Sequence, residues 1–176
     1  MQTETLEIIR KRLAGERLSI ADGIRLLQDA DLLSLGQGAD SMRRQMHPEK
    51  IVSFVIDRNI NYTNICSCQC KFCAFYCKPG DPQGYILSRD ALHDKIKETL
   101  LVGGTQLLIQ GGLHPDLDLE YFENLLRDIK ANFAIHIHSF SPPEIWDLAY
   151  KSNLGIEEVI RRLRDAGLDS IPGGWG

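Results

Sequence analysis

Five cysteines lie within one short segment of the chain, residues 64–77, which reads NICSCQCKFCAFYC. Three of them have the spacing C-x3-C-x2-C: Cys66, Cys70 and Cys73. Cysteine sulfur is the soft ligand that iron–sulfur clusters select. The spacing therefore predicts a single cluster held by three cysteines, which leaves one iron free to bind a small bidentate molecule.

The two remaining cysteines, Cys68 and Cys77, leave other interpretations of this segment open. A structural zinc ion could use four of the five thiolates, although zinc sites usually combine two separated pairs. A ferredoxin-like cluster could use the later cysteines together with one more thiol. Inert buried thiols are a further alternative, but five free thiols at this density would be prone to oxidation.

The composition is that of an ordinary globular domain and excludes several classes of partner. The chain has 176 residues, of which 43% are hydrophobic and 25% charged, with a net charge of -4. This charge gives no reason to expect nucleic acid or an anionic membrane as a partner. We find no apolar window of membrane-spanning length and no secretory signal, so a cytoplasmic location is expected. Cysteines confined to one segment also argue against a disulfide scaffold.

The first 50 residues predict three helices, which form a helical N-terminal layer. The first helix is expected to stop at Gly15. Ser19 and Asp22 have the spacing of a capping box for the second helix, whose apolar stripe would comprise Ile20, Ile24 and Leu27. The third helix is expected to begin near Asp31.

From residue 51 onward, short apolar runs alternate with amphipathic helical patterns. Strands are expected over residues 51–57, continuing towards residue 64, and over 105–110, 134–140 and 167–172. Helices are expected over residues 88–102, 118–130, 141–150 and 156–166. Strands separated by helices are typical of βαβ units and a parallel sheet. In such folds the chemistry lies at the carboxyl ends of the strands, which is where the cysteines, a Gly-Gly-Leu-His turn and a Ser-Phe-Ser turn fall.

Strand alternation identifies candidate site residues on one face of the sheet. In the run AIHIHSF, alternation places His136, His138 and Phe140 on the face that lines a barrel lumen, near the top of the strand. These histidines are candidates for substrate contact or proton transfer, and satisfied core histidines are the alternative. Alternation also places two further groups on lumen-facing sides: Tyr62 and Asn64 with Cys66, and Gln106 with Leu108 and Gln110.

Two further features have both a binding and a purely structural interpretation. Gly111 and Gly112 permit close approach of a ligand to the backbone, or serve only to turn the chain. Glu144 lies in the first turn of an expected helix, where it could act as a capping acid or as a ligand of a ribose.

The cysteine motif, with Phe72 before its last cysteine and a strand before the loop, resembles the radical S-adenosylmethionine (SAM) superfamily. Within it the chain resembles the cyclic dehypoxanthinyl futalosine synthase family over about residues 16–174. The matching segments are INYTNIC, KFCAFY, GYILS, GGTQLLIQGGLHPDL, HIHSFSPPEI and AGLDSIPGG. The related aminofutalosine and deazaflavin-forming synthases share the barrel and are the alternative.

This resemblance implies two cofactors and, together with the strand alternation and the helix position described above, gives a set of candidate site residues. It implies a [4Fe–4S] cluster on Cys66, Cys70 and Cys73, with S-adenosyl-L-methionine bound at the open iron. The residues expected to contact these cofactors are Phe72, Gln110, Gly111, Gly112 and Glu144. The residues expected to act in catalysis are His136, His138 and Tyr62.

The resemblance also implies a reaction and an architecture. The substrate would be dehypoxanthine futalosine, cyclised in menaquinone biosynthesis, with flavodoxin or ferredoxin as electron donor. The family continues through further β/α units, so we expect an α/β fold that is the N-terminal part of a partial β/α barrel over residues 51–176. We expect this sequence to be truncated and inactive by itself. A non-catalytic iron–sulfur or zinc module is the competing function.

Overall fold

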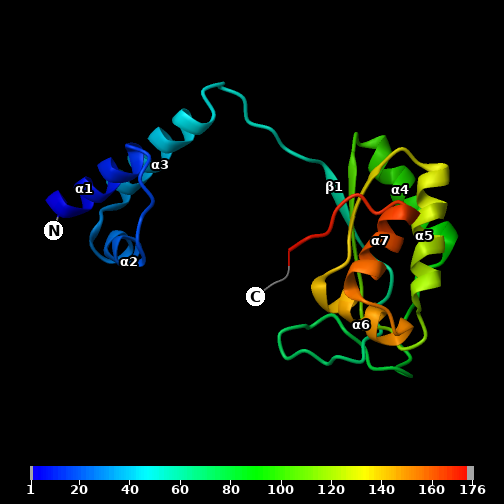
Figure 1. Ribbon diagram of the computed structural model, residues 1–176. Helices are drawn as coiled ribbons and strands as arrows, with labels where there is room; N and C mark the ends of the chain where they lie inside the picture. Colours follow the sequence, from blue (N-terminus) through cyan, green and yellow to red (C-terminus); the bar gives the residue numbers. More distant parts are fainter. Residues whose placement is uncertain (1, 174–176) are drawn as a thin grey trace. The chain divides into compact units, whose positions relative to one another are not determined.

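The computed structural model describes residues 2–173 and divides the chain into two compact units, Met1–Ser53 and Phe54–Gly176 (Figure 1). The first unit is helical, and the second combines helices with a parallel sheet. None of the described helices is long and apolar enough to cross a membrane.

The first unit consists of three helices with the expected caps: α1 (Gln2–Leu13), α2 (Ile20–Asp29) and α3 (Leu32–Met46). The chain leaves α1 through Gly15, whose φ of +95° favours glycine. Ser19 Oγ accepts a hydrogen bond of 3.1 Å from the Asp22 backbone, and Asp22 Oδ2 accepts one of 2.9 Å from the Ser19 backbone. These two bonds confirm the predicted capping box.

The apolar stripe predicted for α2 is not buried within the first unit. Ile20 and Leu27 are 86% and 85% exposed, and Ile24 is 50% exposed. Helices α1 and α3 pack tightly, because a Cβ on Gly38 would lie 2.8 Å from the Ile9 side chain. The helix predicted over the α2 segment is present, but its apolar stripe is left uncovered by α1 and α3.

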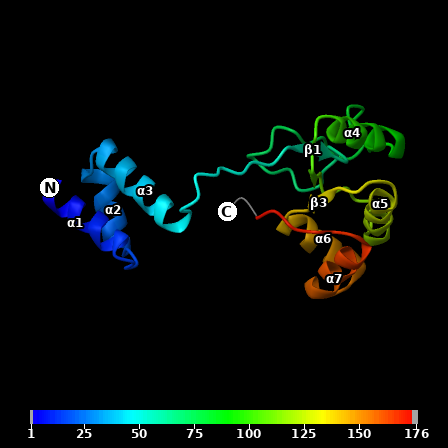
Figure 2. The same cartoon turned by 90° about the horizontal axis from the view of Figure 1, so that it is seen from above.

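The second unit is built on a three-stranded parallel sheet in the order β1-β2-β3. Its strands are β1 (Asp57–Asn61), β2 (Gln106–Gln110) and β3 (His136–Ser139). Its helices are α4 (Arg89–Leu101), α5 (Leu119–Asn132), α6 (Pro142–Ser152) and α7 (Ile156–Ala166) (Figure 2). At least one helix separates each strand from the next, which confirms the βαβ pattern expected of a partial α/β barrel.

Two of the predicted strands differ in the structure. The first strand begins at Asp57, whereas residues 51–56 have no regular structure and are exposed. The apolar residues 51–56 have a high propensity for β-structure. The position of the strand is set by its pairing with β2, however, and this pairing starts with Asp57 opposite Gln106. The expected fourth strand is reduced, within the described residues, to an isolated parallel bridge between His138 and Ser170.

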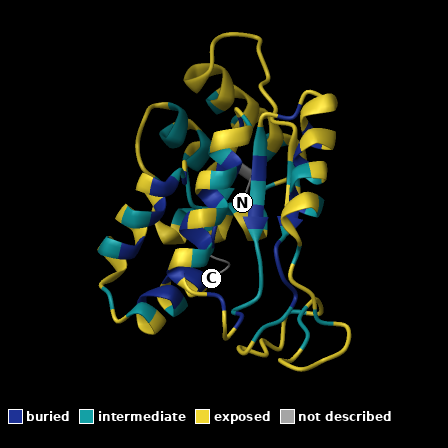
Figure 3. Cartoon of the chain, turned by 90° about the vertical axis from the view of Figure 1, so that its right-hand side faces the viewer, coloured by how far each residue is buried: buried dark blue, intermediate teal, exposed yellow. Residues whose placement is uncertain are grey.

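Alternation along the strands separates a helix-covered face from an open face. Leu107, Ile109 and Ile137 are at most 1% exposed and belong to one core with side chains of the surrounding helices, including Ile96, Leu126 and Leu163 (Figure 3). Side chains on the other face are half-buried or exposed, and we call this face the open face. Its side chains are those of Asp57, Asn59, Asn61, Gln106, Leu108, Gln110, His136 and His138.

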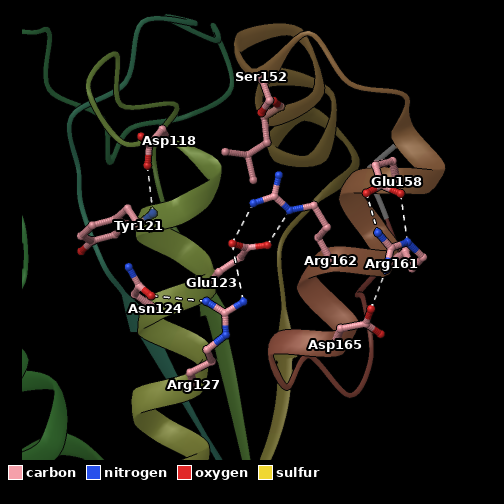
Figure 4. A network of polar contacts seen from close by, with 11 residues as sticks. Asp118, Tyr121, Glu123, Asn124, Arg127, Ser152, Glu158, Arg161, Arg162 and Asp165 are labelled. Carbon is pink, nitrogen blue, oxygen red and sulfur yellow. Dashed lines mark hydrogen bonds and ion pairs between the residues drawn. The ribbon is translucent and has the colours of Figure 1, made fainter.

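An ion pair joins α5 to α7 beside this core. Arg162 donates to both carboxylate oxygens of Glu123, at 2.6 Å from Nε and 2.9 Å from the guanidinium NH2 (Figure 4). Arg127 approaches the same carboxylate at 3.7 Å. The Glu123 side chain is only 7% exposed, so its charge needs these partners. The hydrogen bond from Arg162 is the largest cause that holds the pKa of Glu123 below its usual value.

Candidate active site at the carboxyl edge of the sheet

The cysteine loop leaves β1 and is fixed at both of its ends. The Cys66 backbone donates to the Cys77 carbonyl at 2.9 Å, and the Cys77 backbone donates to the Asn64 carbonyl at 2.7 Å. Asn64, 9% exposed, also donates through Nδ2 to Cys77 Sγ at 3.2 Å and to the Gln83 carbonyl at 3.1 Å. These bonds close the loop between its first and last cysteines.

The sulfur of Cys66 is held by two backbone N–H groups. Leu113 donates to it at 3.3 Å and Cys68 at 3.4 Å. Ser67 returns a hydrogen bond of 3.1 Å from its backbone to the Leu113 carbonyl. The first cysteine is therefore joined to the turn that follows β2.

The other cysteines of the motif are more accessible. Cys70 is exposed and Cys73 is half-buried, and the Cys73 backbone donates to the Cys70 carbonyl at 3.1 Å. Cys70 Sγ lies 3.5 Å from Cys68 Sγ, and this contact is the largest cause of a raised pKa at the Cys68 thiol.

The donor set of this loop fits an iron–sulfur cluster by its chemistry. Three thiols lie on one segment, two of them bracket a tight turn, and Cys66 Sγ is oriented by backbone donors. Within residues 2–173, however, no three His, Cys, Asp or Glu side chains are grouped closely enough to hold a metal ion. The motif thus supplies suitable ligands without forming a closed cage.

The two glycines after β2 are required by contacts within the chain. A Cβ on Gly112 would lie 2.2 Å from the Ile65 carbonyl oxygen, and one on Gly111 would lie 2.5 Å from the Tyr62 ring. The Gly112 backbone also donates to the Thr63 carbonyl at 3.1 Å. Glycine at these positions lets the turn lie directly against the start of the cysteine loop.

Glu144, at the start of α6, connects this turn to β1. Its Oε1 accepts from the Tyr62 hydroxyl at 2.7 Å and from the Gly111 backbone at 3.1 Å. Its Oε2 accepts from the Ser141 backbone at 2.7 Å and from the Ser141 hydroxyl at 2.5 Å. The carboxylate is 4% exposed, so the structure places this predicted cofactor contact in a buried cap.

Burial dominates the protonation of this pair. Desolvation raises the pKa of Glu144, while its four hydrogen bonds act in the opposite direction. Desolvation, followed by the charge of Glu144, raises the pKa of Tyr62 well above its usual value of 10.0. Tyr62 is therefore a neutral hydrogen-bond donor that packs edge-on against Phe122 at a ring-centroid distance of 5.0 Å.

His114 ends the Gly-Gly-Leu-His turn and is 7% exposed. Its Nδ1 accepts from the Asp116 backbone at 3.1 Å, and its carbonyl accepts from Lys151 Nζ of α6 at 2.6 Å. Lys151 also forms an ion pair of 2.6 Å with Asp147. A small pocket lies beside this turn, lined by residues that include Tyr62, Leu113 and His114. No local pattern predicts the contact between Lys151 and His114, because these residues lie 37 positions apart.

Two predicted cofactor contacts lie towards solvent at this edge. Phe72 is 93% exposed on the cysteine loop. Gln110 is half-buried at the end of β2, and its carbonyl accepts from Asn61 Nδ2 at 3.1 Å.

The predicted alternation in β3 is correct for the histidines and wrong for Phe140. Ile135 and Ile137 are buried, while His136 and His138 lie on the open face. Phe140 has a φ of +66°, which breaks the alternation and turns its ring into the core against Phe122. His136 is also not near the top of its strand, because it pairs with Gln106 at the amino end of the sheet.

Comparison with protein-family models identifies the chain. Residues 60–174 match the model described as the Radical SAM superfamily, a range that starts in β1 and includes the cysteine loop. The chain belongs to the radical SAM superfamily. The sequence resemblance to this superfamily is thereby confirmed, together with the fold class it implied.

Two curated relatives are similar to almost the whole chain. Cyclic dehypoxanthine futalosine synthase of Halalkalibacterium halodurans is 48% identical over 168 residues, which cover 95% of this chain and 45% of the relative. FO synthase of Mycobacterium tuberculosis strain H37Rv is 43% identical over 162 residues, which cover 90% of this chain and 18% of the relative. The chain therefore spans less than half the length of either protein.

A solved structure shows the same fold. The FeFe-hydrogenase maturase HydG from Carboxydothermus hydrogenoformans has a TM-score of 0.62 and 22% sequence identity, and the match covers 97% of this chain and 48% of that chain. At this identity the likeness concerns the radical SAM fold alone.

Proposed function

We propose that this chain forms part of a radical SAM enzyme that cyclises dehypoxanthine futalosine in menaquinone biosynthesis. The docking of Cys66 on the Gly-Gly-Leu-His turn carries the proposal, because it holds a thiol of the C-x3-C-x2-C motif against the backbone of that turn. The 48% identity to a cyclic dehypoxanthine futalosine synthase supports this substrate.

Cys66, Cys70 and Cys73 would hold the [4Fe–4S] cluster in this proposal. When bound and reduced, the cluster supplies the electron that cleaves S-adenosyl-L-methionine to a 5′-deoxyadenosyl radical. Cys66 is the thiol whose position the protein fixes in advance, through the N–H groups of Leu113 and Cys68. Cys77 is engaged by Asn64 and is not needed as a ligand.

The turn at Gly111 and Gly112 would contact S-adenosyl-L-methionine through its backbone, with Phe72 and Gln110 nearby on the same edge. Glu144 contributes indirectly in this arrangement, because both of its oxygens already accept hydrogen bonds within the chain. It positions the turn by holding the Gly111 N–H, and Tyr62 in turn holds Glu144.

The open face of the sheet would contact the substrate. By family resemblance, hydrogen is abstracted from the ribose C4′, and the resulting carbon radical adds to the benzoate ring. The ring then loses one electron, to a one-electron acceptor of the ferredoxin or flavodoxin class, and one proton. His138, at the middle of this face, is the proposed proton acceptor, and His136 lies next to it on the same strand.

The test is anaerobic reconstitution, with iron and sulfide, of the full-length enzyme of which this chain would form part, followed by incubation with reductant, S-adenosyl-L-methionine and dehypoxanthine futalosine. The proposal expects 5′-deoxyadenosine and the cyclic product in equal amounts. A purified protein that contains only zinc, or a cluster with four protein sulfurs, would contradict it.

The similarity to FO synthase favours a second candidate, another radical SAM synthase with the same cofactors and a different substrate. 5′-Deoxyadenosine formed without turnover of dehypoxanthine futalosine would support this alternative. Aminofutalosine synthase activity should be assayed in parallel.

A further inference from the structure

Ser170 lies between the two histidines of the open face. Its hydroxyl oxygen is 2.8 Å from His136 Nε2 and 2.6 Å from His138 Nδ1. The backbone fixes this arrangement, because Ser139 donates to the Ser170 carbonyl at 3.0 Å and Ser170 donates to the Ile137 carbonyl at 3.2 Å. The hydroxyl is thus held in place between two rings of one strand.

A serine hydroxyl has one proton, and this couples the two rings. It can donate to only one imidazole nitrogen at a time, so the other ring must itself donate to the hydroxyl oxygen. When Ser170 donates to His136 Nε2, His138 must carry its proton on Nδ1. When Ser170 donates to His138 Nδ1, His136 must carry its proton on Nε2. The tautomers of the two histidines are therefore not independent.

The charged groups around this pair lie at the His136 end. Asp169 Oδ2 is 3.9 Å from His136 Nδ1, and it accepts at 2.6 Å from both Lys130 Nζ and the Ile137 backbone. His136 pairs across the sheet with Gln106, and Gln106 pairs in turn with Asp57. The corresponding partners of His138 are Leu108 and then Asn59, both uncharged.

The two histidines also lie at different depths in the sheet. His138 is half-buried in the middle of the open face, whereas the His136 side chain is 43% exposed at the amino end of β3. The three groups therefore run from the interior of this face to solvent, away from the cysteine loop, which follows the carboxyl end of β1.

We propose that Ser170 joins His138 and His136 into a relay that carries the proton released by the substrate to solvent at the amino end of the sheet. A proton bound at His138 Nε2 is balanced by three transfers: from His138 Nδ1 to Ser170 Oγ, from the Ser170 hydroxyl to His136 Nε2, and from His136 Nδ1 to water beside Asp169. Each group gains one proton and loses one. Ser170 acts here as a positioning residue, and the need for a released proton rests on the proposed function.

The coupling can be tested without catalysis, by ¹⁵N NMR of the whole 176-residue chain. The ring nitrogens of His136 and His138 are assigned from His136→Gln and His138→Gln variants. In the wild type we expect the tautomers of the two rings to depend on each other, so that one ring carries its proton on the nitrogen facing Ser170 when the other does not. Ser170→Ala should remove that dependence, and Ser170→Thr, which keeps the hydroxyl, should retain it. Unchanged ring ¹⁵N shifts in a folded Ser170→Ala variant would overturn the relay.

A second measurement separates the relay from the proposed function. In the reconstituted enzyme, Ser170→Ala should lower kcat by about tenfold or more with KM little changed, and it should alter the solvent deuterium isotope effect. Ser170→Thr should restore most of the rate. An unchanged rate and isotope effect in Ser170→Ala would overturn the relay in catalysis. Persistent NMR coupling in a protein that does not turn over dehypoxanthine futalosine would overturn the proposed function instead.

Discussion

The hydroxyl of Tyr62 donates a hydrogen bond of 2.7 Å to Oε1 of Glu144 within the buried part of the second unit. This bond joins the end of β1 to the start of α6, and the same oxygen accepts from the Gly111 backbone. The turn that contacts Cys66 is therefore held by the hydrogen-bonded side chains of Tyr62 and Glu144, which lie 82 positions apart in sequence.

Tyr62→Phe should destabilise the protein. The substitution leaves the ring contacts in place and removes one donor from a buried carboxylate, so we expect a loss of about 1–2 kcal/mol in the free energy of unfolding, measured with urea. Tyr150→Phe is the matched control, because the Tyr150 ring is 75% exposed and stacked on Trp146. Equal stability of both variants would show that the Tyr62–Glu144 bond contributes nothing.

The same variant should change how stability depends on pH. Burial raises the pKa of Glu144 in the folded protein, so its contribution is fully present below the unfolded pKa of about 4.3 and is lost as pH rises through the folded pKa. The bond from Tyr62 favours the ionised carboxylate, so its removal raises the folded pKa further. The fall in stability with rising pH should then be larger in Tyr62→Phe, measured by urea unfolding from about pH 4 to pH 7. If the free energy of unfolding fell equally with pH in the wild type and in Tyr62→Phe, the predicted effect of the Tyr62 bond on the pKa of Glu144 would be wrong.

Arg162→Met should destabilise the contact between α5 and α7. The substitution removes the guanidinium that donates two hydrogen bonds to the buried Glu123 carboxylate. We expect the free energy of unfolding to fall by about 2 kcal/mol. Arg162 lowers the pKa of Glu123, so this stability is present above the unfolded pKa and is lost as pH falls through the folded pKa. The variant should therefore lose less stability on acidification. Arg161→Met, which removes an exposed pair with Glu158, should change stability by no more than about 0.5 kcal/mol.

Gly112→Ala should separate the turn after β2 from the cysteine loop. The added methyl would lie 2.2 Å from the Ile65 carbonyl, so the backbone must move and Cys66 loses the Leu113 donor. We expect less iron bound after reconstitution, measured against protein concentration. Gly36→Ala is the control, because nothing lies within 4 Å of its Cβ position in α3, and it should retain iron and gain up to about 1 kcal/mol of stability. Full iron content in Gly112→Ala would contradict the proposed support.

Cys66→Ala, Cys70→Ala and Cys73→Ala should each abolish cleavage of S-adenosyl-L-methionine, because each removes a proposed cluster ligand. Cys68→Ala and Cys77→Ala should retain the cluster and the cleavage. The measurements are iron and sulfide content and 5′-deoxyadenosine. Loss of the cluster in either of the last two variants would favour a site with four thiol ligands.

The order of helices and strands could be predicted because it depends on local patterns. Ser88 and Asp118, for example, cap α4 and α5 through hydrogen bonds to residues three positions further on. The exact position of β1 could not be predicted in this way. Residues 51–56 are more apolar and β-branched than Asp57–Asn61, yet pairing with β2 selects the later segment. Phe140 departs from the pattern because a single left-handed residue reverses the alternation.

The candidate site could be predicted in its residue types more than in its contacts. The cysteine spacing, the glycine pair and the two histidines that share one face of a strand are visible in the sequence. The bond from Tyr62 to Glu144, the N–H groups at Cys66 Sγ and the place of Ser170 between the histidines join residues 32 to 82 positions apart or depend on loop conformation. Only the folded chain brings them together.

The separation of the sheet into a helix-covered face and an open face has an evolutionary consequence. Asn59, Gln106 and Gln110 lie on the face opposite the packed Leu107, Ile109 and Ile137, so substitutions at these three positions carry little folding penalty. A scaffold of this kind can diversify while its interior stays fixed. Differently named synthases at 48% and 43% identity to one chain are what such freedom would produce.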